Sequence, residues 1–192
     1  MDDKVVFVES GYLKGKKIIL PPLNTTRSTK SIVKSCVFNV LRYDLKDKIF
    51  IEAFGGSGSM AIEALSNYAN CSIVIEKDKN AYKIIEKNIK NLNIKAFYGD
   101  TFELLPNIIK KLEKNIILYL DPPFDIRNGF MNIYENIYKL IDNLKNDLLD
   151  QIIIEYNSKN KMLNILNNFI NTKTKKFGNT SLAFYKNKDM MK

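Results

Sequence analysis

The stretch Ile116-Ile117-Leu118-Tyr119-Leu120-Asp121-Pro122-Pro123-Phe124 decides the fold, because an apolar run ends abruptly on a carboxylate, two prolines and an aromatic ring. An uninterrupted apolar run with such a stop is typical of a strand that is buried on both faces in a parallel sheet. Proline cannot continue a central strand and restricts the residue before it, so Asp121 and Pro122 are expected to be extended. The stretch predicts a rigid ledge at the carboxyl end of a strand, where open α/β sheets place their ligands.

The length and composition of the chain predict one domain. A chain of 192 residues with 45% hydrophobic content can bury one good core, so we expect a single domain over residues 1–192. Within it we expect an N-terminal extension over 1–45 and the main α/β core over 46–188. No apolar run approaches the roughly 18 residues that span a bilayer, and the first residues lack the features of a secretory signal. We therefore expect a cytoplasmic protein that makes no contact with a membrane.

Two cysteines, Cys36 and Cys71, stand far apart in a chain that contains no histidine. Structural zinc sites and cysteine nucleophiles are usually built from clustered cysteines or from cysteine together with histidine. We therefore expect no metal site, and both cysteines are predicted to be small core residues.

The net charge of +9 is concentrated at the two ends of the chain. Residues 1–34 hold seven basic and three acidic groups, for +4, and residues 172–192 hold six lysines and one aspartate, for +5. The residues between them hold 17 groups of each sign. Contacts of both ends with a polyanion would explain this distribution, because neutralised phosphates release counterions. A lysine-rich composition with solvated ends explains it equally well.

The N-terminal region predicts a small hairpin and a helix. Two short apolar runs, 5–8 and 18–20, flank a basic loop that contains glycine. Apolar residues then recur at spacings of three and four from Val33 to Leu41, which predicts an amphipathic helix as far as about residue 43.

A glycine-rich turn, 55–58, joins a strand pattern at 48–54 to a helix pattern at 60–68. Glycines there let the backbone approach a ligand and present N–H groups at a helix N-terminus. The next strand ends on Glu76, about twenty residues later, which is the spacing of the acid that holds ribose hydroxyls in nucleotide-binding units. The strand after it ends on Asp100, which can equally cap the following helix.

The rest of the chain continues the alternation of strands and helices. The predicted strands of the main sheet span 48–54, 72–76, 96–100, 116–120, 151–155, 173–177 and 181–185, and the predicted helices between them span 60–68, 81–92, 105–112, 130–144 and 162–169. A turn at Gly178 and Asn179 makes the last two strands a hairpin. We therefore expect an α/β fold with a doubly wound, mostly parallel, seven-stranded sheet whose last strand is antiparallel.

Acids at the strand ends and glycines after the first of these strands fit a nucleoside-like ligand, and the arrangement resembles the class I, Rossmann-like S-adenosylmethionine-dependent methyltransferases. The ledge at 121–124 resembles the motif of enzymes that methylate exocyclic amino nitrogens. Further blocks across residues 11–187 resemble the RsmD-type small-subunit rRNA guanine-N2 methyltransferases. These blocks are Gly15-Lys16-Lys17, Pro21-Pro22, Arg27-Ser28-Thr29, Val33-Lys34, Phe38-Asn39, Phe54-Gly55-Gly56-Ser57-Gly58 and Glu63-Ala64-Leu65-Ser66.

The resemblance implies transfer of a methyl group from S-adenosylmethionine to the N2 amine of a guanine in 16S rRNA, within the small subunit or an assembly intermediate. We expect a monomer. The cofactor site that it implies comprises Glu52, Phe54, Gly55, Gly56, Ser57, Gly58, Glu76, Lys77, Asp100 and Thr101. The chain departs from the family at four positions, Ser28, Ile32, Ser35 and Glu52, where proline, arginine, glutamate and aspartate are usual. These departures leave open a different RNA target or a different affinity for it.

The ledge can activate an amino nitrogen without a histidine base. The lone pair of a guanine amine is delocalised into the ring, which makes the amine a poor nucleophile. If Asp121 and the Pro122 carbonyl accept its N–H groups, the nitrogen becomes pyramidal and its lone pair points at the methyl group. Pro123 stiffens the ledge, and Phe124 would stack on a base swung out of the RNA.

Basic side chains at both ends of the chain are expected to contact the RNA backbone. These are Lys16, Lys17, Arg27, Lys30, Lys34, Lys173, Lys175 and Lys176. Two other functions stay open. The same ledge serves a DNA adenine-N6 methyltransferase, although this chain has no sizeable target-recognition insertion. The departures from the family also allow a non-catalytic RNA-binding or ribosome-assembly factor with a degenerate methyltransferase fold.

Overall fold

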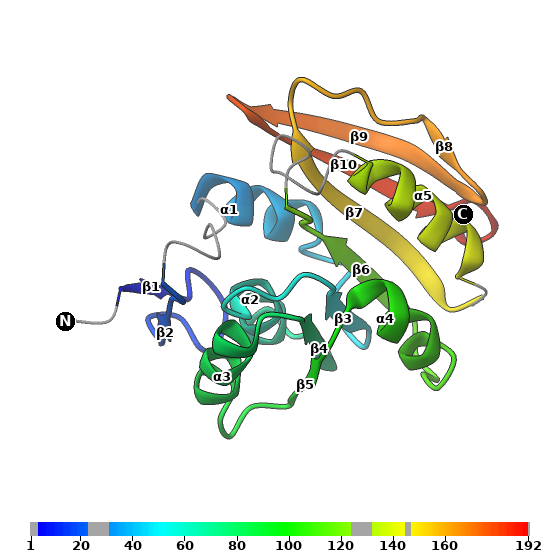
Figure 1. Ribbon diagram of the computed structural model, residues 1–192. Helices are drawn as coiled ribbons and strands as arrows, with labels where there is room; N and C mark the ends of the chain where they lie inside the picture. The colour runs from blue at the N-terminus through cyan, green and yellow to red at the C-terminus, as the bar shows by residue number, and fades with distance from the viewer. Residues whose placement is uncertain (1–3, 23–30, 124–131, 145–146, 192) are drawn as a thin grey trace.

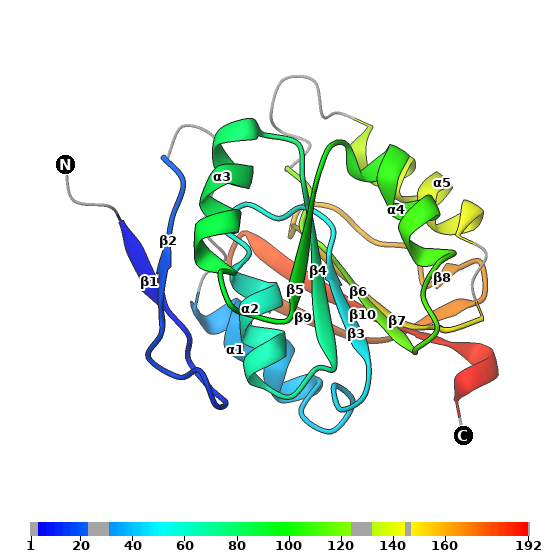
Figure 2. The same ribbon diagram turned by 90° about the horizontal axis from the view of Figure 1, so that it is seen from below.

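A central sheet lies between two layers of helices in the computed structural model, as Figures 1 and 2 show. The structure describes residues 4–22, 31–123, 132–144 and 147–191. Helices α1 (Ser31–Val40), α2 (Ser59–Ser66) and α3 (Lys79–Asn88) cover one face of the sheet, and α4 (Thr101–Ile109) and α5 (Ile133–Asn143) cover the other. The expected doubly wound α/β architecture is confirmed.

The main sheet has the strand order β5-β4-β3-β6-β7-β10-β9-β8. Its strands are β3 (Ile49–Glu52), β4 (Cys71–Glu76), β5 (Ile94–Tyr98), β6 (Ile116–Leu120), β7 (Leu149–Asn157), β8 (Ile165–Leu166), β9 (Phe169–Phe177) and β10 (Thr180–Asn187). The strands from β5 to β7 run parallel, whereas β10, β9 and β8 join by antiparallel pairing. The chain winds outward in both directions from β3 and β6, and this switch point is where such sheets bind ligands.

The predicted helix at 162–169 is wrong. This segment instead forms β8 and enters β9, with Ile165 paired to Ile170 and Leu166 paired to Phe169. The turn between the two strands contains Asn167, whose left-handed backbone has a φ of 51°, a conformation that asparagine tolerates well. A spacing of three between buried apolar residues fits a tight hairpin as well as a helix. The sheet therefore has eight strands rather than seven.

The N-terminal extension forms the predicted hairpin and helix. Strands β1 (Val5–Phe7) and β2 (Lys17–Ile19) pair antiparallel, and the loop between them packs on the C-terminal end of α2. Gly11 is required at that contact, because a Cβ there would lie 1.8 Å from the backbone oxygen of Ser66. Helix α1 then packs over the sheet through Val33 and Val37, which are both fully buried.

Strand β6 is buried along its whole length, as its apolar run predicted. Its side chains alternate between the two helical layers. Leu118 packs in the cluster with α4 and α5, whereas Tyr119 packs in the cluster with α1 and α2. The two cysteines lie at the margins of these clusters and are only half-buried. In the part of the chain that the structure describes, no helix is long and apolar enough to cross a membrane.

Candidate active site

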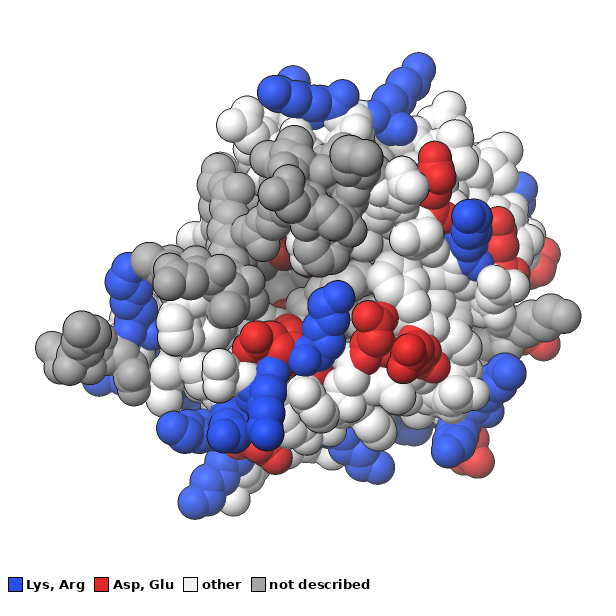
Figure 3. Space-filling model, viewed as in Figure 1, with Lys and Arg blue, Asp and Glu red and all other residues white. Residues whose placement is uncertain are grey.

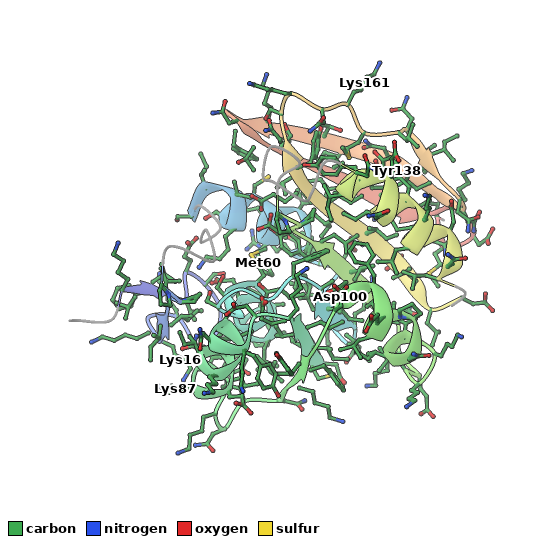
Figure 4. All side chains as sticks on the ribbon, viewed as in Figure 1. Lys16, Met60, Lys87, Asp100, Tyr138 and Lys161 are labelled. Atoms are coloured by element: carbon green, nitrogen blue, oxygen red, sulfur yellow. The ribbon has the colours of Figure 1, made fainter. Side chains whose placement is uncertain are left out.

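The candidate site lies at the carboxyl ends of β3, β4, β5 and β6. These strands are parallel, so their ends meet at one edge of the sheet, and each is closed or followed by an acid: Glu52, Glu76, Asp100 or Asp121. In the space-filling view of Figure 3, acidic side chains lie near the middle of the visible surface, with basic side chains around them. Figure 4 shows Asp100 at the start of α4. The structure thus brings together four acids that the sequence places far apart.

Glu52 caps helix α2 from the neighbouring strand. Its carboxylate accepts the N–H groups of Ala61 at 2.9 Å and Met60 at 3.4 Å, while the cap residue of α2, Gly58, offers no side chain. Only 4% of Glu52 is exposed, and burial raises its pKa to about 8 although the two N–H groups oppose the shift. The structure therefore shows Glu52 as a support for the turn, and its direct contact with a cofactor stays a prediction.

The glycine turn needs glycine for both space and backbone shape. A Cβ on Gly55 would lie 2.4 Å from Cγ1 of Val74, and Gly56 and Gly58 adopt left-handed backbone with φ of 53° and 75°. The carbonyl of buried Ser57 accepts a hydrogen bond from Asn88 Nδ2 at 2.9 Å. The turn is therefore held in one shape with its backbone close to the strand ends.

Asn88 was missed by sequence reasoning. Its side chain also bonds both backbone groups of Ile19, with Oδ1 accepting the N–H and Nδ2 donating to the carbonyl, each at 2.9 Å. One amide of α3 thereby ties β2 to the glycine turn. A single asparagine in a helix gives no sequence signal for this role, because it depends on where β2 lies in space.

Glu76 and Asp100 flank the turn. Glu76 accepts the N–H groups of Gly56 at 2.6 Å and Asp78 at 2.7 Å, and burial raises its pKa despite these bonds. Asp100 caps α4 by accepting the Phe102 N–H at 2.8 Å, which confirms the capping role that the sequence allowed. Lys77 forms an ion pair with Asp100 at 3.6 Å, and both side chains are partly exposed. Backbone N–H groups thus hold both carboxylates in place, and both residues remain partly accessible to solvent.

Two further predicted cofactor residues support the floor of the site. The hydroxyl of Thr101 is buried and donates to the carbonyl of Ala53, which links α4 to the end of β3. Phe54 packs edge-on against Phe102 with ring centroids 6.0 Å apart. Thr101 and Phe54 are thus brought to the same strand ends as the glycine turn, and their contact with a cofactor stays a prediction.

The ledge ends β6 where the sequence predicted. Strand β6 stops at Leu120, Asp121 and Pro123 are partly exposed, and Pro122 is buried. Phe124 lies outside the described residues, as do Arg27, Ser28 and Lys30. Asp121 lies near Tyr119, because its charge adds to the burial that raises the pKa of the Tyr119 phenol.

The structure contradicts the assignment of Lys34 to RNA contact. Lys34 is 3% exposed, and its ammonium lies 3.3 Å from Glu9 and 3.3 Å from Glu63 and donates to the Phe7 carbonyl at 3.1 Å. The ammonium holds the N-terminal hairpin against α1 and α2. Ser35, one of the departures from the family, donates to Glu9 at 2.7 Å and so belongs to the same network.

The other predicted RNA-contacting lysines lie on the surface. Lys17 is exposed and Lys16 is half-buried, and three exposed lysines lie on β9: Lys173, Lys175 and Lys176. Burial raises the pKa of the Cys36 thiol in α1, and the charges of Lys175 and Lys173 oppose that shift. Lys173 and Lys175 therefore lie near α1, on the face of the sheet that α1 and α2 cover.

The site suits a nucleoside cofactor bearing a positive charge. Carboxylates at adjacent strand ends can accept ribose hydroxyls and a base amino group, and the glycine turn lets the backbone approach closely. No cluster of His, Cys, Asp or Glu suited to a metal ion occurs among residues 4–22, 31–123, 132–144 and 147–191. This fold and this site define a class I S-adenosylmethionine-dependent methyltransferase.

Proteins of similar sequence show to which family of methyltransferases the chain belongs. Residues 6–186 match the family described as Conserved hypothetical protein 95. The ribosomal RNA small subunit methyltransferase D of Buchnera aphidicola subsp. Baizongia pistaciae is 31% identical over 184 residues, which are 93% of this chain and 90% of that protein. The protein of the same name from Escherichia coli K12 is 30% identical over 133 residues, 69% of this chain and 65% of that protein. The chain therefore belongs to this family of methyltransferases.

Solved structures agree with the fold. A putative methyltransferase from Escherichia coli, yhhF, matches with a TM-score of 0.75 at 25% identity. The match includes 96% of this chain and 98% of that protein's chain. An RNA methyltransferase from Salinibacter ruber, solved with S-adenosyl-L-homocysteine, has a TM-score of 0.52 at 14% identity over 86% of this chain and 97% of its own. The more distant similarity supports the fold alone.

Proposed function

We propose that this protein transfers a methyl group from S-adenosylmethionine to the N2 amine of a guanine in 16S rRNA, in the small subunit or an assembly intermediate. The observation that carries the proposal is the position of the Asp-Pro-Pro ledge, which follows β6 beside the glycine turn that follows β3. Family membership supports rRNA as the substrate, because the relatives are named for it. The choice of guanine rests on the resemblance in sequence.

The acidic strand ends would hold the cofactor. Glu76 would accept the ribose hydroxyls, Asp100 would lie near the base amino group, and the backbone of the glycine turn would run beneath the sugar. When bound, the cofactor supplies a methyl group made electrophilic by its attachment to a sulfonium. The carboxylates around it favour that positive charge.

The ledge would orient the acceptor. The Asp121 carboxylate and the Pro122 carbonyl accept the two N–H groups of the amine, so its lone pair is directed away from the ring and toward the methyl group. Pro122 and Pro123 hold these acceptors in place, so little reorganisation accompanies the reaction. The amine loses one proton after transfer, and Asp121 can accept it.

Mass mapping of methylated nucleosides tests the proposal directly. Purified protein, S-adenosylmethionine and either free 16S rRNA or small subunits lacking this modification should yield one N2-methylguanine. N6-methyladenine in a DNA substrate would instead support the adenine-specific alternative. A non-catalytic assembly factor should release no heat on titration with S-adenosylmethionine and should leave both nucleic acids unmethylated.

The exposed lysines of β9 should contribute to RNA affinity through their charge. Replacement of Lys173, Lys175 and Lys176 by alanine should weaken binding and flatten its salt dependence. The slope of log K against log salt is negative, and its magnitude should decrease by about 0.7 to 0.9 for each phosphate that these lysines neutralise in the wild type. Filter binding of 16S rRNA between about 50 and 200 mM salt measures this slope.

A matched variant separates local contact from net charge. Lys110, Lys111 and Lys114 are exposed and lie just before β6, at the amino ends of the parallel strands and so opposite the site. Their replacement by alanine removes the same charge, but the salt slope of this variant should equal that of the wild type. Equal slopes in the two triple variants would mean that the lysines of β9 make no local contact.

A further inference from the structure

The amide of Asn88, the last residue of α3, connects the N-terminal hairpin to the glycine turn. Its Oδ1 accepts the N–H of Ile19, and its Nδ2 donates to the carbonyls of Ile19 and Ser57, each at 2.9 Å. A primary amide has two donor hydrogens and one acceptor oxygen, and here all of them are engaged. Only 5% of Asn88 is exposed, so these bonds form in the interior of the protein.

The backbone of Ile19 fixes which way this amide points. If the nitrogen and the oxygen of Asn88 exchanged places, Nδ2 would face an N–H group, and Oδ1 would face the carbonyls of Ile19 and Ser57. Buried polar groups would then be left without hydrogen bonds, which costs free energy. Strand β2 therefore selects the orientation in which Nδ2 donates to the glycine turn.

Apolar packing holds the same three segments together. Ile85 lies three residues before Asn88 on the same face of α3, and a Cβ on Gly58 would lie 3.6 Å from its Cγ2. Ile18 of β2 is fully buried in one cluster with Ile85. Figure 2 shows β2 beside α3. Helix α3 thus carries an apolar and a polar contact to the turn on one face.

The hairpin is also bonded to α2, the helix that begins directly after the glycine turn. The Glu63 carboxylate accepts the N–H of Ser10 at 2.8 Å, and the Ser66 hydroxyl accepts the N–H of Leu13 at 2.9 Å. The hairpin therefore spans the helix that follows the turn and the helix that packs against it. A displaced hairpin would lose its bonds to α2 and would free the amide of Asn88 to rotate away from Ser57.

We propose that Asn88 is a positioning residue for the cofactor, through which docking of the N-terminal hairpin holds the glycine turn in the shape that binds S-adenosylmethionine. This inference rests on the proposed function, in which the backbone of the turn runs beneath the sugar of the cofactor. A turn that is ordered before binding spares the cofactor the free energy of ordering it. The hairpin, which lies outside the α/β core, thus contributes to cofactor affinity.

Asn88→Ala tests the inference. Calorimetric titration should show that the Kd for S-adenosylmethionine rises about tenfold, because the turn loses the donor of a buried carbonyl. The kcat at saturating cofactor should stay within about twofold of the wild type, because the ledge after β6 is distant from the change. A loss in kcat without a change in Kd would contradict a role in cofactor binding.

Asn187→Ala is the matched control. Asn187 is 6% exposed, its Nδ2 donates to the Leu149 carbonyl at 3.0 Å, and its Oδ1 accepts from Asn168 Nδ2 and the Asp189 N–H. It lies at the end of β10 beside the start of β7, far from the glycine turn. This variant loses as many buried bonds, yet its Kd should stay within about twofold of the wild type. Equal Kd values in the two variants would overturn the inference.

Ile19→Pro tests the bond from the side of the hairpin and leaves Asn88 in place if Asn88→Ala does not fold. The Ile19 N–H donates to Asn88, and proline is tolerated in an edge strand where its nitrogen makes no ladder bond. The Kd should rise about threefold, and the double variant with Asn88→Ala should bind no more weakly than Asn88→Ala alone. Additive losses would contradict the coupling.

Hydrogen exchange of the Ile19 N–H supplies a readout that needs no RNA. Because coupling between two sites is reciprocal, saturating S-adenosylmethionine should slow this exchange by up to about tenfold in the wild type. In Asn88→Ala the cofactor should have no such effect. Exchange in the wild type that does not respond to bound cofactor would overturn the inference, whether or not the protein methylates rRNA. A wild-type protein that does not bind S-adenosylmethionine would instead contradict the proposed function.

Discussion

Replacement of Asp121 by alanine should lower the rate of methyl transfer by about a hundredfold to a thousandfold while leaving the affinity for S-adenosylmethionine within about twofold. The carboxylate is one of the two proposed acceptors of the amine, and it follows β6. The proposed cofactor contacts lie on other strands, because Glu76 ends β4 and Asp100 follows β5. Single-turnover transfer to 16S rRNA and calorimetric titration measure the two quantities separately.

Two companion variants sharpen this test. Asp121→Asn keeps an acceptor oxygen and the shape of the side chain but removes the charge, so its residual rate measures how much of the effect is electrostatic. Asp142→Ala removes an exposed carboxylate near the end of α5 and should change neither quantity. An Asp121→Ala protein as fast as Asp142→Ala would end the proposed mechanism.

Replacement of Lys34 by methionine should lower the free energy of unfolding by about 3–5 kcal/mol. The change leaves the half-buried Glu9 and the buried Glu63 without the ammonium that lies 3.3 Å from each. Glu63 is 1% exposed and also accepts the N–H groups of Glu9 and Ser10, so the loss should loosen the hairpin from α2. Urea unfolding followed by far-UV circular dichroism measures the change.

The control for Lys34 is Lys175→Met, which removes the same charge from an exposed position on β9. It should change the unfolding free energy by no more than about 0.5 kcal/mol. Adding Glu63→Gln to Lys34→Met should restore part of the stability, because one uncompensated buried charge is removed. A stable Lys34→Met protein with weakened RNA binding would instead support an RNA-contacting role for Lys34.

The sequence by itself determined the alternation of strands and helices and the place where β6 ends. The apolar run, the two prolines and the glycines act within a few residues of themselves, through backbone restrictions and burial periodicity. The same local rules fail at 162–169, where apolar residues three apart fit both a helix and the tight β8–β9 hairpin. The hairpin is formed because Leu166 and Phe169 are buried together in the cluster with α5.

Only the tertiary structure decided what the charged and polar groups do. Lys34 and Glu63 meet across 29 positions of sequence, Tyr119 and Glu155 across 36, and Ser57 and Asn88 across 31. A lysine in a basic segment has the same local pattern whether it binds a phosphate or a buried carboxylate. The choice depends on the low dielectric of a packed interior, where charges must be paired, and on which strands the sheet brings side by side.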